Sequence, residues 1–207
     1  MPRRLFIDTH KGVTFLVILF LMAYFHQWGN TTAWIYLALH GTYGMLWVLK
    51  SHIFPDKKWE EKISVWWGIL YYWGGMTLYW VAPFLITSRG VEAPSWMLAL
   101  AISLYTLGIF LHFTADMQKY VQLNLHPGQL ITGGMLRRTR SINYFGELLI
   151  YGAFAMLAMY WLPFLILGLV IAIEWLPNMN RKDRSLARYP EFAEYRRNTR
   201  KFIPFIY

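Results

Sequence analysis

Four long apolar runs carry no Lys, Arg, Asp or Glu, and this feature restricts the possible folds of the chain more than any other. The runs cover residues 12–28, 33–49, 63–86 and 95–113. A helix needs about 20 apolar residues to cross a bilayer, whereas a soluble helix of that length exposes a polar side. Charged residues make up 15% of the chain, against about 25% in soluble domains. We therefore predict an all-α, polytopic membrane helical bundle.

A fifth apolar region, residues 148–175, is too long for one ordinary crossing. At about 1.5 Å per residue, its helix would extend about 42 Å, which exceeds a bilayer core of about 30 Å. Trp161, Leu162 and Pro163 interrupt the region. It therefore forms either one tilted, kinked helix or a helical hairpin that turns at Pro163.

The positions of the basic residues distinguish these two alternatives. Counted between the apolar runs from the N-terminus onward, Lys and Arg number 3, 0, 4, 1, 4, 0 and 8, with the second zero at Pro163. Cytoplasmic loops carry the excess of Lys and Arg, and a single last crossing would place the 8 tail charges outside. We therefore expect four spans plus a C-terminal hairpin, about six transmembrane helices, with both termini in the cytoplasm.

The net charge of +9 first suggests an anionic partner such as nucleic acid. The predicted topology places 19 of the 20 basic residues at the cytoplasmic side, so we expect the bilayer and a lipid as partners and no nucleic acid. The chain has no Cys, which excludes a disulfide, a thiolate nucleophile and a Cys-ligated metal. No metal site is predicted.

The organisation expected is one integral membrane domain over residues 1–207. Residues 1–113 form its four-span part, and residues 114–207 carry most of the polar residues. The host membrane would be the cytoplasmic membrane of a bacterium or the endoplasmic reticulum of a eukaryote. The oligomeric state is left open.

The most informative polar residue of the second part is Glu147, which stands at the start of the last apolar region. A carboxylate at the mouth of an intramembrane helix is costly unless it is paired, and by default it indicates a functional site. The alternative is a helix start at which Glu interacts favourably with the helix dipole. Glu174 also lies in an apolar stretch, with an interfacial position or pairing to Arg140 or Arg181 as its alternatives to catalysis.

The tail, residues 178–207, is basic and aromatic. One interpretation is an anchor on anionic lipid whose aromatic end enters the interface. The other is a lid whose guanidinium groups bind the phosphates of a nucleotide. Composition does not separate the two.

Several motifs in the second part resemble a known family. They are Ala115-Asp116, Gln118-Lys119, Pro127-Gly128, Gly134, Asn143-Tyr144-Phe145-Gly146-Glu147, Trp161-Leu162-Pro163, Tyr195 and Ile203-Pro204-Phe205. Together they resemble the C-terminal domain of the steroid 5-alpha-reductase family, which shares its membrane core with sterol reductases and isoprenylcysteine carboxyl methyltransferases. The resemblance covers about 90 residues, and the Asn-Tyr-x-Gly-Glu element combined with the ending is its most specific part.

One departure from the pattern points toward reduction. Many relatives, including the methyltransferases, carry Arg-His-Pro before the Tyr, whereas this chain has Arg140, Ser141 and Ile142. That motif helps to hold the methyl donor in those relatives, and the 5-alpha-reductases lack it while keeping the Asn and the Glu.

The resemblance implies NADPH as the cofactor, bound in a cavity open to the cytoplasm. Asn143 and Glu147 would hydrogen-bond the nicotinamide carboxamide, and Asp116 would anchor the ribose or adenosine side. The remaining residues of the implied cofactor site are the phosphate-neutralising Arg137, Arg140, Arg181 and Arg184, together with Lys119 and Tyr144.

The implied substrate is a lipid enone, such as a steroid or another isoprenoid carbonyl. Hydride would attack the carbon beta to the carbonyl while a neutral acid stabilises the developing charge on oxygen. Family members use a Glu and a Tyr as the acid, and the first 110 residues contain no intramembrane Glu. His40 and Tyr43, three positions apart on one helix face, are the candidate catalytic residues, with ordinary packing between helices as the alternative.

Two other classes of function remain open. A methyltransferase that uses S-adenosylmethionine would keep the same membrane core. A non-catalytic lipid-binding membrane protein would need no cofactor and would tolerate Glu147→Gln without loss of ligand.

Overall fold

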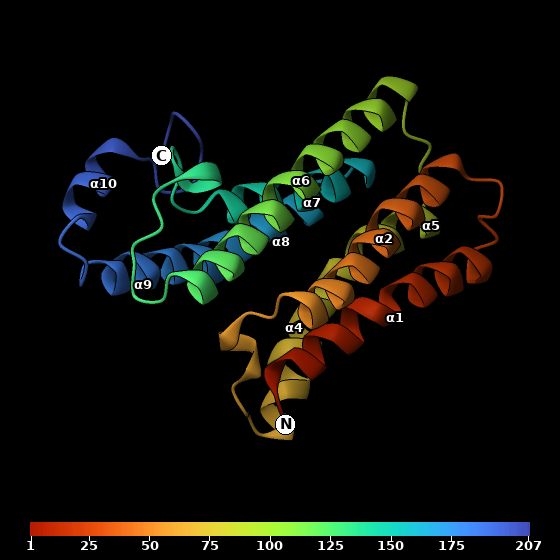
Figure 1. Ribbon diagram of the computed structural model, residues 1–207. Helices are drawn as coiled ribbons and strands as arrows, with labels where there is room; N and C mark the ends of the chain where they lie inside the picture. The colour runs from red at the N-terminus through yellow and green to blue at the C-terminus, as the bar shows by residue number, and fades with distance from the viewer. The chain divides into compact units, whose positions relative to one another are not determined.

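A computed structural model describes residues 1–207, which form helices and turns without a strand. Near the N-terminus, α1 (Arg3–Tyr24) and α2 (Thr31–Ile53) lie side by side as an antiparallel pair (Figure 1). Asn30 begins α2, because its side-chain oxygen accepts a hydrogen bond of 2.8 Å from the backbone N–H of Ala33. The all-α prediction is confirmed.

The third long helix covers Val65–Ser88 and is irregular. It consists of α3 (Val65–Trp67), a π-helical stretch (Gly68–Trp73), α4 (Gly74–Thr77), a 3-10 turn (Leu78–Trp80) and α5 (Val81–Ser88). α5 packs against both α1 and α2. Changes of helical pitch within one helix often mark functional sites, so this helix is a candidate location for one.

The rest of the chain contains three longer helical stretches and several short helices. They are α6 (Ser95–Leu125), α7 (Ile142–Leu157), α8 (Trp161–Val170) with its continuation through a π-helical stretch (Ile171–Trp175) into α9 (Leu176–Leu186), α10 (Phe192–Asn198), and 3-10 turns at Lys57–Glu60 and Gly134–Leu136.

The predicted interruption of the last apolar region is confirmed, but its position was predicted wrongly. The helix breaks at residues 158–160, where Met159 has a φ of 47°, and Pro163 is the third residue of α8. Proline is tolerated there because the backbone N–H groups of a first helical turn have no partner within the helix. Pro163 therefore belongs to the start of the next helix.

Four helices are long and apolar enough to cross a membrane: Arg3–Tyr24, Val65–Ser88, Ser95–Leu125 and Trp161–Leu186. Large apolar side chains such as Leu16, Phe20, Trp66 and Leu70 are exposed on them, as expected where lipid replaces water. α2, with 23 residues, is not among these four, and α7 has only 16 residues. The chain thus has the helices of an integral membrane protein, while six crossings and cytoplasmic termini stay predictions.

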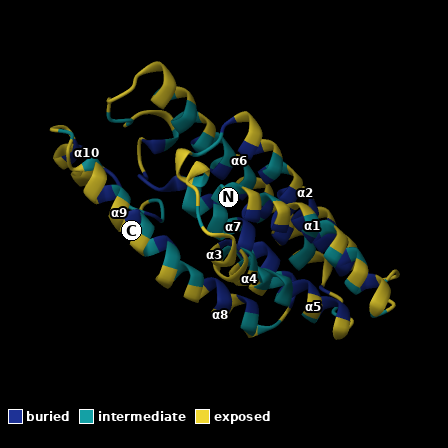
Figure 2. Cartoon of the chain, turned by 90° about the horizontal axis from the view of Figure 1, so that it is seen from below, coloured by how far each residue is buried: buried dark blue, intermediate teal, exposed yellow.

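The chain divides into two compact units, which we describe separately. Unit 1 comprises Met1–Tyr105 and Tyr151–Ile166. In its α1–α2 pair, a Cβ on Gly44 would lie 2.3 Å from the Lys11 carbonyl oxygen, so glycine is required for this backbone approach. Buried and exposed residues alternate along both helices in Figure 2, as expected of helices that bury one side only.

Unit 2 comprises Thr106–Ile150 and Leu167–Tyr207. Its parts of α6 and α7 also approach closely, because a Cβ on Gly146 would lie 2.6 Å from the backbone nitrogen of His112. The tail is tied to the segment before α7 by backbone hydrogen bonds between Arg140 N–H and the Arg200 carbonyl and between Arg200 N–H and the Arg138 carbonyl, of 2.8 and 2.9 Å. These two contacts position the polar residues around the start of α7.

Candidate functional site

In unit 2 the start of α7 brings together two residues that the sequence assigned to the cofactor site. Asn143 Nδ2 donates a hydrogen bond of 3.2 Å to Asp116 Oδ1. Asp116 comes from α6, and its other carboxylate oxygen lies 3.9 Å from His112 Nε2. Glu147 follows Asn143 by four residues, on the same side of α7, and is half-buried. An amide and two carboxylates thus come from two adjacent helices.

Gly146 explains why this cluster is possible. His112 Nδ1 lies 3.2 Å from the Asn143 carbonyl oxygen, where α6 and α7 approach closely. Only glycine fits at position 146, as the contact with the His112 backbone shows. His112 was not among the predicted site residues, and its signal was its place four residues before Asp116 in an otherwise apolar run.

Arg140 occupies a different environment from the other predicted phosphate-binding residues. It is 4% exposed, and its Nε and one terminal nitrogen donate to the two carboxylate oxygens of Asp183, at 3.2 and 3.1 Å. The other terminal nitrogen donates to the carbonyl and hydroxyl oxygens of Thr199, at 2.8 and 2.9 Å, and to the Arg196 carbonyl at 3.3 Å. The Lys182 ammonium donates to the Arg140 carbonyl. Arg140 therefore holds the tail in place.

The remaining predicted cofactor residues lie at or near the surface of unit 2. Arg137, Arg181 and Arg184 are exposed, and Lys119 is half-buried. Arg181 donates a hydrogen bond of 2.8 Å to the Asn178 side chain. The ring of Tyr144 packs against that of Trp175 at 5.6 Å.

Tyr195, part of the motif that resembles the family tail, is buried. Its hydroxyl donates a hydrogen bond of 2.7 Å to the Leu136 carbonyl, and burial raises its pKa to about 12. A phenol that stays neutral and hydrogen-bonded links α10 to the 3-10 turn at Gly134–Leu136.

In unit 1 the two predicted catalytic residues are both buried on α2, but they have different partners. His40 Nδ1 lies 2.9 Å from the Tyr36 hydroxyl, and its ring stacks on Phe154 at 4.3 Å. Tyr43 is fully buried and accepts a hydrogen bond of 3.4 Å from the Tyr151 hydroxyl. The two residues therefore belong to separate hydrogen-bonded groups.

The partner that makes Tyr43 notable is Lys11, which was not among the predicted site residues. α1 begins at Arg3, so Lys11 lies two turns inside a helix that can cross a membrane, and it is 8% exposed. Its ammonium donates a hydrogen bond of 2.9 Å to the Tyr151 hydroxyl and lies 4.3 and 4.4 Å from the ring centres of Tyr43 and Trp47. Aromatic faces attract cations, so this cage stabilises the buried charge.

A second buried group surrounds His10, the neighbour of Lys11. Its ring stacks on Trp80 at 4.5 Å and meets Trp73 edge-on at 5.2 Å. Trp80 donates a hydrogen bond of 3.0 Å to the Thr14 hydroxyl, while His10 Nε2 is buried without a hydrogen-bond partner. The irregular third helix supplies both tryptophans.

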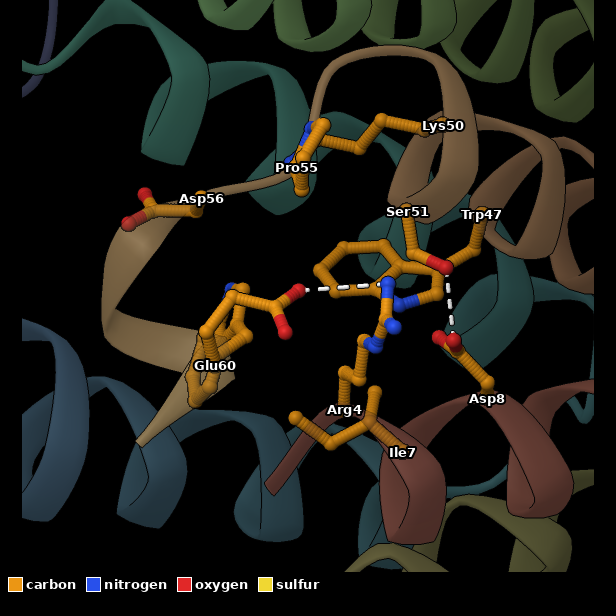
Figure 3. A pocket seen from close by; sticks show the side chains of 10 residues that line it. Arg4, Ile7, Asp8, Trp47, Lys50, Ser51, Pro55, Asp56 and Glu60 are labelled. Atoms are coloured by element: carbon orange, nitrogen blue, oxygen red, sulfur yellow. Dashed lines mark hydrogen bonds and ion pairs between the residues drawn. The ribbon is translucent and has the colours of Figure 1, made fainter. Parts of the chain in front are cut away.

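A small pocket lies at the end of the α1–α2 pair (Figure 3). Arg4, Asp8, Trp47, Lys50, Ser51 and Glu60 are among the residues that line it. Two interactions cross the pocket: Ser51 donates to Asp8 Oδ2 at 2.6 Å, and Arg4 forms an ion pair with Glu60 at 3.2 Å, both visible in Figure 3. Asp8 Oδ1 is buried without a hydrogen-bond partner.

In comparisons with known proteins, no protein-family model matches the chain, and no curated protein matches it. The resemblance to the steroid 5-alpha-reductase family therefore stays a prediction based on the motifs.

Proposed function

We propose that the protein is a membrane-embedded, NADPH-dependent reductase of a carbon–carbon double bond conjugated to a carbonyl group in a steroid-like or isoprenoid lipid. The observation that carries the proposal is the cluster at the start of α7, where Asn143 is hydrogen-bonded to Asp116 and Glu147 follows one turn later. A nicotinamide carboxamide offers both a donor and an acceptor, and an amide beside carboxylates complements it. The residues present therefore fit this part of the cofactor.

The phosphates would be bound by the exposed basic residues of unit 2. Arg137, Arg181 and Arg184 are exposed, with Lys119 half-buried, and guanidinium groups bind phosphates through paired hydrogen bonds. Arg140 takes a different part in this proposal, since Asp183, Thr199 and Arg196 already accept its hydrogen bonds. It positions the tail on which Arg181 and Arg184 stand.

Bound NADPH would supply a hydride to the carbon beta to the substrate carbonyl. The residues of unit 2 would orient it: Asn143 and Glu147 hold the carboxamide, and Asp116 fixes the Asn143 side chain. In unit 1, the Tyr43 hydroxyl would hydrogen-bond the carbonyl oxygen and stabilise the enolate-like charge. His40, whose ring nitrogen is paired with Tyr36, would shape this part of unit 1.

Cofactor binding is tested by titrating the purified full-length protein with NADPH and following the nucleotide fluorescence. Glu147→Gln should weaken binding about 10- to 100-fold, since it removes a charge-assisted hydrogen bond. Glu174→Gln is the matched control, because Glu174 is another half-buried carboxylate of unit 2 outside the cluster, and it should leave affinity unchanged.

Activity is tested by NADPH consumption across a panel of lipid enones. Binding of S-adenosylmethionine without NADPH would favour the methyltransferase alternative. Unchanged NADPH affinity in Glu147→Gln would contradict the proposed cofactor site, and binding of a lipid without any nucleotide would favour the lipid-binding alternative.

The topology that the proposal requires has six crossing helices and cytoplasmic termini. The chain has no Cys, so single cysteines introduced near each end can be labelled with an impermeant maleimide in sealed vesicles of known orientation. Labelling from the cytoplasmic side only is expected at both ends. Labelling of the two ends from opposite sides would contradict the six-helix topology.

A further inference from the structure

The strongest unexplained feature of the molecule is the position of Lys11. A lysine within a membrane-spanning helix is costly, and such residues in general serve function. The flanking positions do not account for it, since α1 begins eight residues earlier and has Arg3 and Arg4 in its first turn. Aromatic rings stabilise its charge, but an apolar side chain at this position would need no such cage.

The hydrogen bonds of Lys11 form a chain with one direction. The Lys11 ammonium donates to the Tyr151 hydroxyl at 2.9 Å, and that hydroxyl donates to the Tyr43 hydroxyl at 3.4 Å. Each donor thus points toward Tyr43, so a proton lost from Tyr43 can be replaced by two transfers along these hydrogen bonds. The ammonium of Lys11 also offsets the negative charge left on a phenol oxygen.

The same helix connects Lys11 to the pocket of Figure 3. Asp8 lies one turn before Lys11 on α1, and its Oδ1 is buried without a hydrogen-bond partner. The Trp47 ring lines the pocket and also lies 4.4 Å from the Lys11 ammonium. Only one aromatic layer therefore separates Lys11 from a polar pocket at the end of the α1–α2 pair.

We propose that Lys11 is the proton source of the reduction and that Tyr151 passes its proton to Tyr43. This inference rests on the proposed function. The enone would accept, at its beta carbon, the hydride that bound NADPH supplies, and the electron pair of the double bond would move to the carbonyl oxygen as an enolate. Tyr43 gives its proton to the enolate oxygen, Tyr151 reprotonates Tyr43, and Lys11 reprotonates Tyr151. The enol tautomerises to the saturated carbonyl and Lys11 is reprotonated from solvent, so the sum is one hydride and one proton added per double bond.

Tyr79 of the irregular third helix covers one end of this chain of hydroxyl groups. It stacks on Tyr151 at 4.5 Å and stands in the 3-10 turn Leu78–Trp80, close after the π-helical stretch Gly68–Trp73. Substrate access in this proposal is beside Tyr79.

The test compares Lys11→Met, Lys11→Arg and Tyr151→Phe with Tyr36→Phe in the full chain. Lys11→Met and Tyr151→Phe should lower enone turnover at least about 100-fold, as expected for loss of a general acid, and leave NADPH affinity unchanged. Lys11→Arg keeps the charge and a donor but does not release a proton at working pH, so it should be as slow as Lys11→Met. Tyr36→Phe removes an equally buried hydroxyl outside the chain and should keep its turnover.

A second measurement is independent of activity. In substrate-free protein labelled with ¹³C at the tyrosine ring carbon that bears the hydroxyl, Lys11→Met should shift the Tyr151 and Tyr43 resonances and leave that of Tyr36 in place. Unchanged Tyr151 and Tyr43 resonances in Lys11→Met would overturn the hydrogen-bonded chain.

The outcomes separate the inference from the proposed function. If the wild-type protein reduces enones and Lys11→Met or Lys11→Arg keeps the full rate, only the assignment of Lys11 as the proton source is overturned. A wild-type protein that binds no NADPH and reduces no enone overturns the proposed function, and the relay with it.

Discussion

Both units bury a cation, and the way each is surrounded differs. Arg140 in unit 2 donates to five acceptor atoms, which belong to Asp183, Thr199 and Arg196. Lys11 in unit 1 donates to a phenol and lies over the aromatic rings of Tyr43 and Trp47. The first arrangement fixes a guanidinium by acceptors on several sides, and the second connects an ammonium to a chain of hydroxyl groups.

These surroundings distinguish a charge that stabilises the fold from one that can take part in a reaction. A planar guanidinium stays protonated, and one whose three nitrogens all donate to the protein is held in place by it, so its contribution is to stability. An ammonium that heads a directed chain can transfer a proton.

Replacement of Arg140 should give the largest loss of stability. Arg140→Leu leaves the Asp183 carboxylate buried without its ion-pair partner and frees the tail, which should cost about 3–5 kcal/mol. Thermal unfolding of the purified protein in detergent measures it, and Arg137→Met, three residues earlier and exposed, is the control. An equal effect of the two substitutions would contradict the structural role of Arg140. Partial recovery is expected in Arg140→Leu with Asp183→Leu, which removes both charges.

The close helix approaches should be the next most sensitive positions. A Cβ at Gly146 meets the His112 backbone at 2.6 Å, and one at Gly44 meets the Lys11 carbonyl at 2.3 Å. Gly146→Ala and Gly44→Ala should each cost about 1–3 kcal/mol in thermal unfolding, because backbone cannot move aside as a flexible side chain can. Gly152→Ala, also in α7 but with no atom within 4 Å of the added Cβ, should be neutral or slightly stabilising. A destabilised Gly152→Ala would show that helix propensity alone does not predict the sign.

The helices could be predicted because charge-free runs of this length have few alternatives in physical chemistry. The turn after α7 was predicted only approximately, since sequence does not show whether Pro163 ends one helix or begins the next. Met159, with its positive φ, makes the turn, and no sequence rule singles out a methionine for that conformation.

Only part of the candidate site could be predicted, because some of its contacts join residues that are far apart in the sequence. Asn143 and Asp116 were assigned to one site through the resemblance, and the structure joins them by a hydrogen bond. Lys11 was missed because it borders the apolar run, and its burial depends on Tyr151, 140 residues further along the chain. Arg140 was assigned to phosphates because its partner Asp183 lies 43 residues away. Contacts between residues far apart in the sequence therefore decide whether a basic residue such as Arg140 stabilises the fold or binds a ligand.

Loss of the Tyr195 hydrogen bond in unit 2 should have a smaller effect on stability. Tyr195→Phe removes a bond to the Leu136 carbonyl and should cost about 1 kcal/mol at neutral pH. The pKa of Tyr195 is raised to about 12, from about 10 in an unfolded chain, so its contribution is complete below pH 10 and is lost as the pH rises to 12. Thermal unfolding from pH 8 to 12 should therefore show a steeper decline for the wild type than for Tyr195→Phe. Parallel curves would contradict the raised pKa.

Lys11→Met should have the smallest effect on stability, although it is expected to stop the relay. Methionine has nearly the length of lysine and is compatible with the rings of Tyr43 and Trp47, and replacement of a buried charge by an apolar group of similar volume is often close to neutral. Its unfolding free energy should lie within about 1 kcal/mol of wild type, several-fold less than the loss in Arg140→Leu. The two variants together dissociate stability from turnover, because Arg140 is held by acceptors that need it, whereas Lys11 is held by rings that accept an apolar chain equally well. A loss as large as that of Arg140→Leu would mean that Lys11 is also structural and that the two units use their buried cations in the same way.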